Sequence, residues 1–285
     1  MKNRQRLLSA LLVSTAALSL QACGNNPVTT NELIIGLECN YAPFNWTENS
    51  ANEFTLPISN HPGQYADGYD IQIAKLLSQK TGKSVKIVAT EWTSLVPDLA
   101  ANNINAIIAG MTDTEERRKT IDFTTEYYHS ELVLVTSATI ANQFEGRIIS
   151  ESEFRTFISS KKVISQVETV TDSIIDIFAN NYGAIHATPL SSFALAATDV
   201  SNGSVDMMTA ELPVANSIVS SFTNLGIVHI SQSILGESQA ELGVSIGIAK
   251  GNIELANALN KALAEISDSQ RVELMSAAIS RSTNK

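Results

Sequence analysis

Apolar runs of strand length alternate with helical patterns along this chain, and the alternation limits the folds that it can adopt. In the first part the order is strand, helix, strand, helix, strand, over residues 33–37, 70–80, 85–89, 95–101 and 105–109. This order is typical of α/β domains built on a largely parallel sheet. Residues 38–68, rich in Asn, Pro, Ser and Gly, predict a long extended loop.

The alternation starts again after a predicted strand at residues 132–135. Strands are expected at 163–165, 205–208, 227–230 and 244–249, and helices at about 171–180, 191–200, 213–221, 255–266 and 270–279. A chain of 285 residues is long enough for two domains of ordinary size. We therefore expect two α/β units.

The N-terminus has the pattern of an export signal. Lys2, Arg4 and Arg6 precede an uncharged run over residues 7–20 that is short for a bilayer span. The next residues, Leu-Gln-Ala-Cys, resemble the lipobox of bacterial lipoproteins, in which the cysteine is lipidated. We expect residues 1–22 to be a lipoprotein signal peptide, Cys23 to carry the lipid and residues 23–31 to form a tether. The alternative is ordinary secretion with a free Cys23.

The charge of the expected mature chain excludes one class of partner. Removal of residues 1–22 takes away three positive charges and no negative ones, so the formal net charge moves from −10 to −13. Such an acidic chain lacks the electrostatic footprint of a protein that binds nucleic acid. Besides Cys23 only Cys39 remains, and one unlipidated cysteine cannot form an internal disulfide.

A short stretch behind the apolar run at 106–109 carries the groups of a carboxylate clamp. Gly110 allows a ligand to approach the backbone closely, Thr112 can donate a hydrogen bond, and Arg117 offers a planar fork that matches a carboxylate. The alternative is an exposed helix start, because residues 115–118 read Glu-Glu-Arg-Arg and would suit a mixed-charge first turn.

Three further residues stand where predicted strands end. Trp92, Thr169 and Glu211 follow the apolar runs at 85–89, 163–165 and 205–209. Because the strand ends of a parallel sheet face the ligand crevice, Trp92 could wall a site and Glu211 could receive an ammonium group. The free amides beyond Thr169 could attract a carboxylate. The alternatives are a core tryptophan, an ordinary helix cap and an acid in a helix's first turn.

The sequence lacks the common signatures of catalytic and metal sites. Its four histidines are far apart, and it contains no HExxH pair, nucleophile elbow, Walker loop or dinucleotide-binding glycine motif. We therefore expect no catalytic residue, no metal and no cofactor, and a protein that is not an enzyme.

Several motifs, in this order, resemble the extracellular solute-binding proteins of polar amino-acid ABC transporters. They are Ile34-Ile35-Gly36, Tyr41-Ala42-Pro43-Phe44, Gly68-Tyr69-Asp70-Ile71, Trp92 to Pro97, Ile107 to Thr112, Thr114 to Arg117, Asp122-Phe123-Thr124 and Tyr127-Tyr128. The resemblance covers nearly the whole mature chain. It implies an α/β fold of the type II periplasmic-binding-protein class, with two lobes, two crossing strands between them and a ligand cleft. Lobe 1 would comprise residues 32–130 and 235–285, and lobe 2 residues 131–234.

The resemblance also implies how an amino acid would be held. Four groups would hold its α-carboxylate: Arg117, Thr112, Thr169 and the amide of Val170. Two would hold its α-ammonium: the Gly110 carbonyl and Glu211. Tyr41 and Trp92 would enclose the side chain, with Glu38 nearby. The chain departs from the family pattern at Ala109, where serine is frequent, at Glu168, where glycine is usual, at Glu211, where aspartate is commoner, and in the longer segment 49–66.

The resemblance implies a lipid-anchored receptor outside the cytoplasm, attached to the cell membrane as a lipoprotein. It would act as a monomer that captures a polar amino acid and delivers it to an ABC permease. Glu38 and the acidic balance favour a cationic ligand such as arginine, lysine or histidine. The alternatives are an enzyme of the same fold, such as a cyclohexadienyl-type dehydratase with Glu38 or Glu211 as general acid, or a sensor module.

Overall fold

The structure, a computed structural model, describes residues 31–283, and within this range it leaves the side chains of 237–241 undescribed. The predicted signal peptide (1–22), Cys23 and all but the last residue of the predicted tether (23–31) lie outside the described residues. Among the helices of the described part, none combines the length and the apolar character that a membrane span requires.

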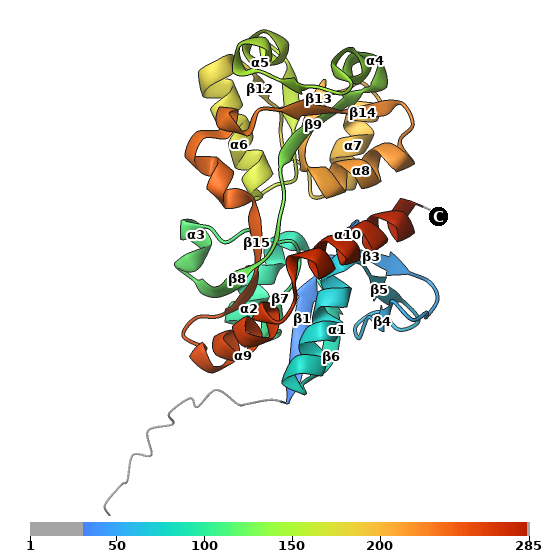
Figure 1. The fold of residues 1–285 in the computed structure, drawn as a ribbon, viewed down its shortest axis with the longest axis vertical. Helices are drawn as coiled ribbons and strands as arrows, with labels where there is room; N and C mark the ends of the chain where they lie inside the picture. The colour runs from blue at the N-terminus through green and yellow to red at the C-terminus, as the bar shows by residue number, and fades with distance from the viewer. Residues whose placement is uncertain (1–30, 284–285) are drawn as a thin grey trace, which may run out of the picture.

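Two mixed sheets form the two lobes of the molecule (Figure 1). The sheet of the first lobe has the order β6-β1-β7-β15-β8, from Ser84–Ala89, Glu32–Leu37, Ala106–Ile107, Gly243–Ala249 and Ile121–His129. The sheet of the second lobe has the order β10-β14-β9-β13-β11-β12, from Ile148–Ile149, Leu225–Ile230, Leu132–Ser137, Met207–Glu211, Lys162–Ile164 and Ile185–His186. The two-lobe α/β fold is therefore confirmed.

The predicted sheets are only partly parallel, because the strands near the crossings run against their neighbours. In the first sheet β1 pairs in parallel with β6 and β7, whereas β15 is antiparallel to β7 and β8. In the second sheet β9 is antiparallel to β13 and β14. Strands β8, β9 and β15 lie next to the two points where the chain crosses between the lobes. They therefore run in the direction opposite to that of the neighbouring strands.

The helices cover both sheets and include every predicted one, whereas α4 and α5 of the second lobe were not predicted. Helices α1, α2 and α9 pack against the first sheet or against one another there; they are Tyr69–Thr81, Leu95–Ala100 and Ile253–Ala264. Helices α4 to α8 belong to the second lobe: Ala138–Ala141, Glu151–Ile158, Val170–Tyr182, Phe193–Ser201 and Leu212–Ser221. Residues Leu132 to Val135 of β9 are fully buried, as expected for a strand covered on both faces.

The long loop predicted for residues 38–68 is wrong. This segment forms a small antiparallel sheet of order β2-β3-β5-β4, from Asn40–Tyr41, Asn45–Glu48, Tyr65–Asp67 and Leu56–Pro57. Its strands have only two to four residues. Runs that short carry no readable alternation of apolar and polar residues, so the sequence pattern shows only their turn-rich composition.

The last helix, α10 (Asp268–Thr283), lies between the two lobes (Figure 1). It packs against α1 of the first lobe and α8 of the second. Near its end, Arg281 forms a two-pronged ion pair with Asp67, with both nitrogen-to-oxygen distances 2.9 Å. The helix is thereby fixed to the small sheet.

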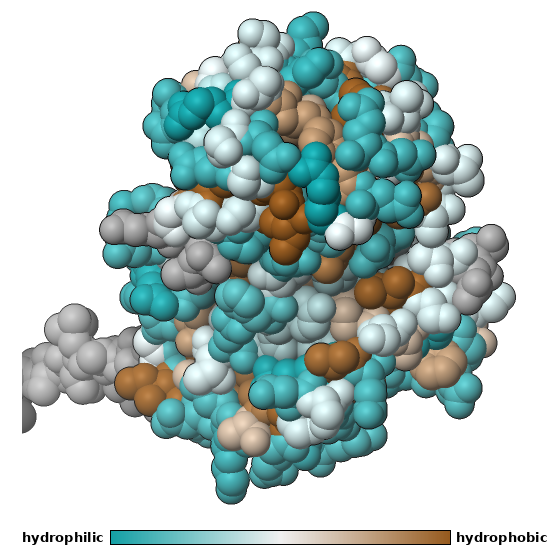
Figure 2. All heavy atoms as spheres, turned by 45° about the horizontal axis from the view of Figure 1, so that its top comes forward, coloured by the Kyte–Doolittle hydropathy of each residue, from teal (hydrophilic) through white to brown (hydrophobic). Residues whose placement is uncertain are grey.

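The face drawn in Figure 2 is mainly hydrophilic, with apolar side chains in small separate groups. Among the described residues, the exposed large apolar side chains belong to separate elements, such as Ile148 on β10, Ile253 on α9 and Val272 on α10. Scattered residues of this kind are normal on a protein surface.

Candidate ligand-binding site

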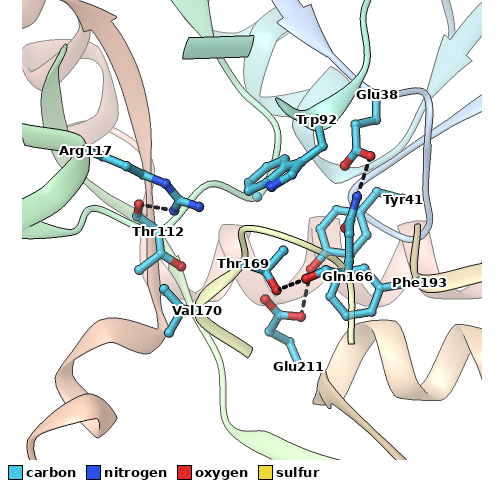
Figure 3. Close-up of a pocket in the computed structure, with 11 residues that line it drawn as sticks. Glu38, Tyr41, Trp92, Thr112, Arg117, Gln166, Thr169, Val170, Phe193 and Glu211 are labelled. Carbon is cyan, nitrogen blue, oxygen red and sulfur yellow. Dashed lines mark hydrogen bonds between the residues drawn. The ribbon is translucent and has the colours of Figure 1, made fainter. Parts of the chain in front are cut away.

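A cavity between the two lobes gathers all nine residues predicted to bind a ligand (Figure 3). The first lobe contributes Glu38, Tyr41, Trp92, Gly110, Thr112 and Arg117, and the second Gln166, Thr169, Val170, Phe193 and Glu211. Gln166 and Phe193 were not predicted. The cavity has room for roughly one water molecule, because the volume that the centre of a water can occupy is about 10 Å³.

Arg117 belongs to a single helical turn, α3 (Glu115–Arg118), and its side chain turns toward the cavity. The Thr114 hydroxyl caps this turn by accepting the Arg117 N–H at 3.2 Å. The guanidinium donates to the Thr112 carbonyl at 2.7 Å and lies 5.1 Å from the centre of the Trp92 ring. The charged helix start and the inward-facing guanidinium, which the sequence presented as alternatives, thus occur together.

Glu168 reaches across the gap with its backbone rather than with its exposed side chain. Its carbonyl accepts hydrogen bonds from Arg117 Nη2 at 2.9 Å and from Trp92 Nε1 at 3.3 Å. Glu168 has a φ of 59°, in the left-handed region that side chains disfavour. This backbone shape gives a physical reason why glycine would suit the position.

Helix α6 directs its N-terminus at the cavity. The Thr169 hydroxyl accepts the Asp172 N–H at 3.1 Å and donates to the Gln166 carbonyl at 2.7 Å. Val170 is the first residue of the helix. N–H groups in a first helical turn have no partner within the helix, so such an end attracts an anion.

Glu211 is a buried carboxyl group at the junction of β13 and α8. Its Oε2 accepts the Tyr41 hydroxyl at 2.7 Å. Burial raises the pKa of Glu211, and the bond from Tyr41 lowers it. The Tyr41 ring is stacked between Phe44 and Phe193, with centroid distances of 5.2 and 5.0 Å.

Glu38 faces the cavity from the first lobe. Its Oε1 accepts a hydrogen bond from Gln166 Nε2 at 2.8 Å. Burial raises the pKa of Glu38 to about 7; the bond from Gln166 lowers it and the nearby Glu91 raises it. Gln166 is 2% exposed and donates also to the Ser191 carbonyl, so its amide is held between two acceptors.

The site separates its charges. Arg117 and Thr112 lie on one side of the cavity, and the carboxyl groups of Glu38 and Glu211 lie on the other (Figure 3). This arrangement complements a ligand that carries an anionic group at one end and cationic groups at the other. Within residues 31–283, no three His, Cys, Asp or Glu side chains come together as metal ligands would.

Tyr41 and Trp92 both line the cavity, although their rings have different neighbours. Trp92 pairs with the Arg117 guanidinium, whereas Tyr41 packs between two phenylalanines. The predicted enclosure of a ligand side chain between Tyr41 and Trp92 stays a prediction.

Comparison with known proteins connects this fold and site to one family. Residues 33–278 match the family described as bacterial extracellular solute-binding proteins, family 3. The chain is 25% identical over 261 residues to the L-arginine-binding protein of Pseudomonas aeruginosa, covering 90% of this chain and 88% of that protein. It is 26% identical over 136 residues to the arginine-binding extracellular protein ArtP of Bacillus subtilis, a match that spans about half of each protein, 46% and 48%.

A solved structure shares the fold. The amino-acid ABC transporter substrate-binding protein AbpA of Streptococcus pneumoniae, bound to L-arginine, superimposes with a TM-score of 0.72. The superposition covers 90% of this chain and 97% of AbpA, at 21% sequence identity.

Proposed function

Because the chain belongs to family 3 of the bacterial extracellular solute-binding proteins, we propose that it is a receptor that captures a free amino acid and delivers it to an ABC permease. The observation that carries this proposal is the separation of charge across the cavity. An amino acid presents a carboxylate and an ammonium group a short distance apart, and each can be desolvated at low cost only against an opposite charge.

The carboxylate would bind beside the positive groups. Arg117 would exchange the Glu168 carbonyl for the ligand carboxylate, which is a stronger, charge-assisted partner. Thr112, Thr169 and the amide of Val170 would complete this half of the site. The Gly110 carbonyl and Glu211 would take the ammonium group.

The ligand would be cationic, with arginine as the first candidate. Glu38 supports this choice, because a carboxyl group that faces the cavity can pair with a guanidinium, ammonium or imidazolium group. The two relatives, both named as arginine-binding proteins, support it as well. They are also named as binding proteins, which supports a receptor without catalytic activity.

The proposal includes the export of the receptor and its attachment to the membrane. The lipobox-like residues 20–23 support lipidation of Cys23 after removal of residues 1–22, with 23–31 as a tether and attachment to the outer side of the cell membrane. The protein would act as a monomer whose lobe 1 comprises residues 32–130 and 235–285 and whose lobe 2 comprises 131–234.

A thermal-shift screen of the chain without residues 1–22 against the twenty amino acids tests the ligand. A ligand that binds only the folded protein stabilises it, by about 2.7 kcal/mol when the free ligand is at a hundred times its Kd. The melting temperature rises as a result. We expect arginine, or another cationic amino acid, to give the largest shift. Absence of a shift with all twenty would contradict the proposal.

Two arginine variants test the site. Arg117→Ala should weaken binding by about 2–5 kcal/mol, or roughly 30- to 4,000-fold, because the ligand carboxylate loses its charged partner. Arg118→Ala is the matched control, because Arg118 pairs with Asp113 and its side chain is 62% exposed. Equal affinity of the two variants in calorimetry would exclude the proposed clamp.

A further inference from the structure

A buried chain of hydrogen bonds runs behind the cavity and joins two backbone turns. On one side, Cys39 N donates to Asn45 Oδ1 and Asn45 Nδ2 donates to Asp70 Oδ2, both at 2.8 Å. On the other side, Gly110 N donates to Tyr127 Oη at 3.0 Å, and Tyr127 Oη donates to Asp70 Oδ1 at 2.7 Å. The side chains of Asn45, Asp70 and Tyr127 belong to residues with no exposed surface.

The direction of every bond in this chain is determined by its ends. A backbone N–H can only donate, so the Asn45 carbonyl oxygen must face Cys39 and its amide nitrogen must face Asp70. In the same way, the Tyr127 oxygen accepts from Gly110 and must send its own proton to Asp70. Asp70 is therefore the common acceptor of both arms. An ionised carboxylate is acceptor-only at both oxygens, whereas a protonated one would also need an acceptor for its own proton.

Both ends of the chain are turns with unusual backbone geometry. Cys39 and Gly110 each have a φ of 59°, in the left-handed region. For Cys39, which has a side chain, this conformation is unfavourable and needs support from its surroundings. At Gly110 there is no room for a side chain, because a Cβ atom would lie 2.8 Å from Tyr41 Cε1.

These turns carry groups of the proposed binding site. Cys39 follows Glu38, so the turn sets the direction in which the Glu38 carboxyl leaves the backbone. Gly110 presents the carbonyl proposed for the ligand ammonium. Another contact of Asp70 reinforces this placement: its own N–H donates to the carbonyl of Phe44, whose ring stacks on Tyr41.

We propose that Asp70 is a positioning residue of the binding site, which holds the Glu38 and Gly110 turns in register with each other through Asn45 and Tyr127. The importance of the two turns for binding rests on the proposed function. The hydrogen-bond arrangement itself can be tested without any ligand.

The first measurement is amide hydrogen exchange of Cys39 and Gly110, followed by NMR on the folded protein. Burial raises the pKa of Asp70 to about 7 and its two donors lower it, so the work is done at about pH 8, where the carboxylate is ionised. Asp70→Asn replaces one acceptor by an N–H, and we expect faster exchange at both turns. Tyr127→Phe removes only a hydroxyl, and we expect faster exchange at Gly110 while Cys39 stays protected.

The second measurement is arginine affinity by calorimetry. Asp70→Asn should weaken binding about tenfold or more, with a smaller loss for Tyr127→Phe, because a buried donor without an acceptor forces a turn to move. Phe154→Leu is the control for lost stability alone, since Phe154 is fully buried in the core of the second lobe. It should lower the melting temperature and leave both amides and the affinity unchanged.

The outcomes separate the two proposals. If wild-type protein binds no amino acid, the proposed function fails, and the exchange pattern still decides whether Asp70 holds both turns. If Asp70→Asn binds arginine within about twofold of wild type and both amides stay protected, Asp70 has no positioning role. If Asp70→Asn does not fold, Tyr127→Phe decides instead. Unchanged arginine affinity and continued protection of both amides in that variant overturn the proposal.

Discussion

Glu38 is a carboxyl group in surroundings that oppose its charge. Burial raises its pKa to about 7, and the neighbouring Glu91 acts in the same direction. The charged form of Glu38 accepts a hydrogen bond from the Gln166 amide, which is neutral. A cationic ligand side chain would supply the missing positive charge, so binding of such a ligand and loss of the Glu38 proton should be coupled.

We predict that arginine binds more tightly as pH rises from about 5 to about 8. Below its pKa of about 7, Glu38 carries a proton that must leave before an ion pair can form, so affinity falls by up to about tenfold per pH unit. Calorimetry of wild type and Glu38→Gln over this range checks it. Burial also raises the pKa of Glu211, so the variant keeps a weaker dependence. Identical pH profiles of the two proteins would contradict the role of Glu38.

The site residues that could be predicted differ in kind from those that could not. Trp92, Thr169 and Glu211 stand at predicted strand ends, which made them candidates; the resemblance to a family then suggested their roles. Gln166 and Phe193 line the cavity through contacts with Glu38 and Tyr41, which lie more than a hundred residues away in the chain. The sequence near these residues carries no signal of such a contact, although Gln166 lies three residues before the predicted helix cap Thr169.

At the scale of elements, helix α10 is attached to the first lobe by a nearly buried ion pair. Asp67 is 3% exposed and the Arg281 side chain 18% exposed, and the guanidinium lies 4.3 Å from the centre of the Phe54 ring. Removal of one partner from such a pair leaves a buried charge without compensation, which costs more than the pair itself contributes.

We expect Arg281→Ala to lower the free energy of unfolding by about 3–5 kcal/mol, because Asp67 stays buried without its partner. Arg118→Ala, which breaks the exposed pair with Asp113, should change it by about 0–1 kcal/mol. Urea denaturation of both variants beside wild type measures the difference. Equal stabilities would show that α10 is held by its apolar contacts alone.

Helices with several apolar turns were predictable, whereas strand β8 and the strands of the small sheet were not. Helices such as α1 and α9 repeat their apolar residues over several turns, and Gly82 marks the end of α1 with a φ of 71°. Strand β8 (Ile121–His129) was not predicted because its exposed Thr125 and Glu126 interrupt the run of buried residues. The strands of the small sheet are too short to show an alternation of apolar and polar residues.

At the scale of the whole molecule, the two lobes are joined across the cavity by side chains that also serve the proposed site. Tyr41 bonds Glu211, Gln166 bonds Glu38, and Arg117 bonds the Glu168 carbonyl. These bonds stabilise a closed arrangement of the lobes, and a ligand would have to replace or extend them.

We predict that the double variant Tyr41→Phe, Gln166→Ala opens more readily without ligand. Two hydrogen bonds at about 1 kcal/mol each would change the closed-to-open ratio roughly 30-fold, so small-angle X-ray scattering should give a larger radius of gyration. The matched control is Tyr182→Phe, Gln143→Ala, which removes the same groups from bonds inside the second lobe. Scattering curves that coincide for both variants would contradict the prediction.

The register of β8 and β15 gives the second lobe a particular place in the chain. His129 and Gly243 are partners in the antiparallel ladder, so the chain leaves the first sheet and re-enters it at neighbouring points. In topological terms, residues 130–242, which include the proposed lobe 2 (131–234), are an insertion into the turn of a hairpin. Genetic exchange of this insert between relatives, or its replacement by a two-residue turn, would therefore leave the ends of the first lobe already aligned for joining.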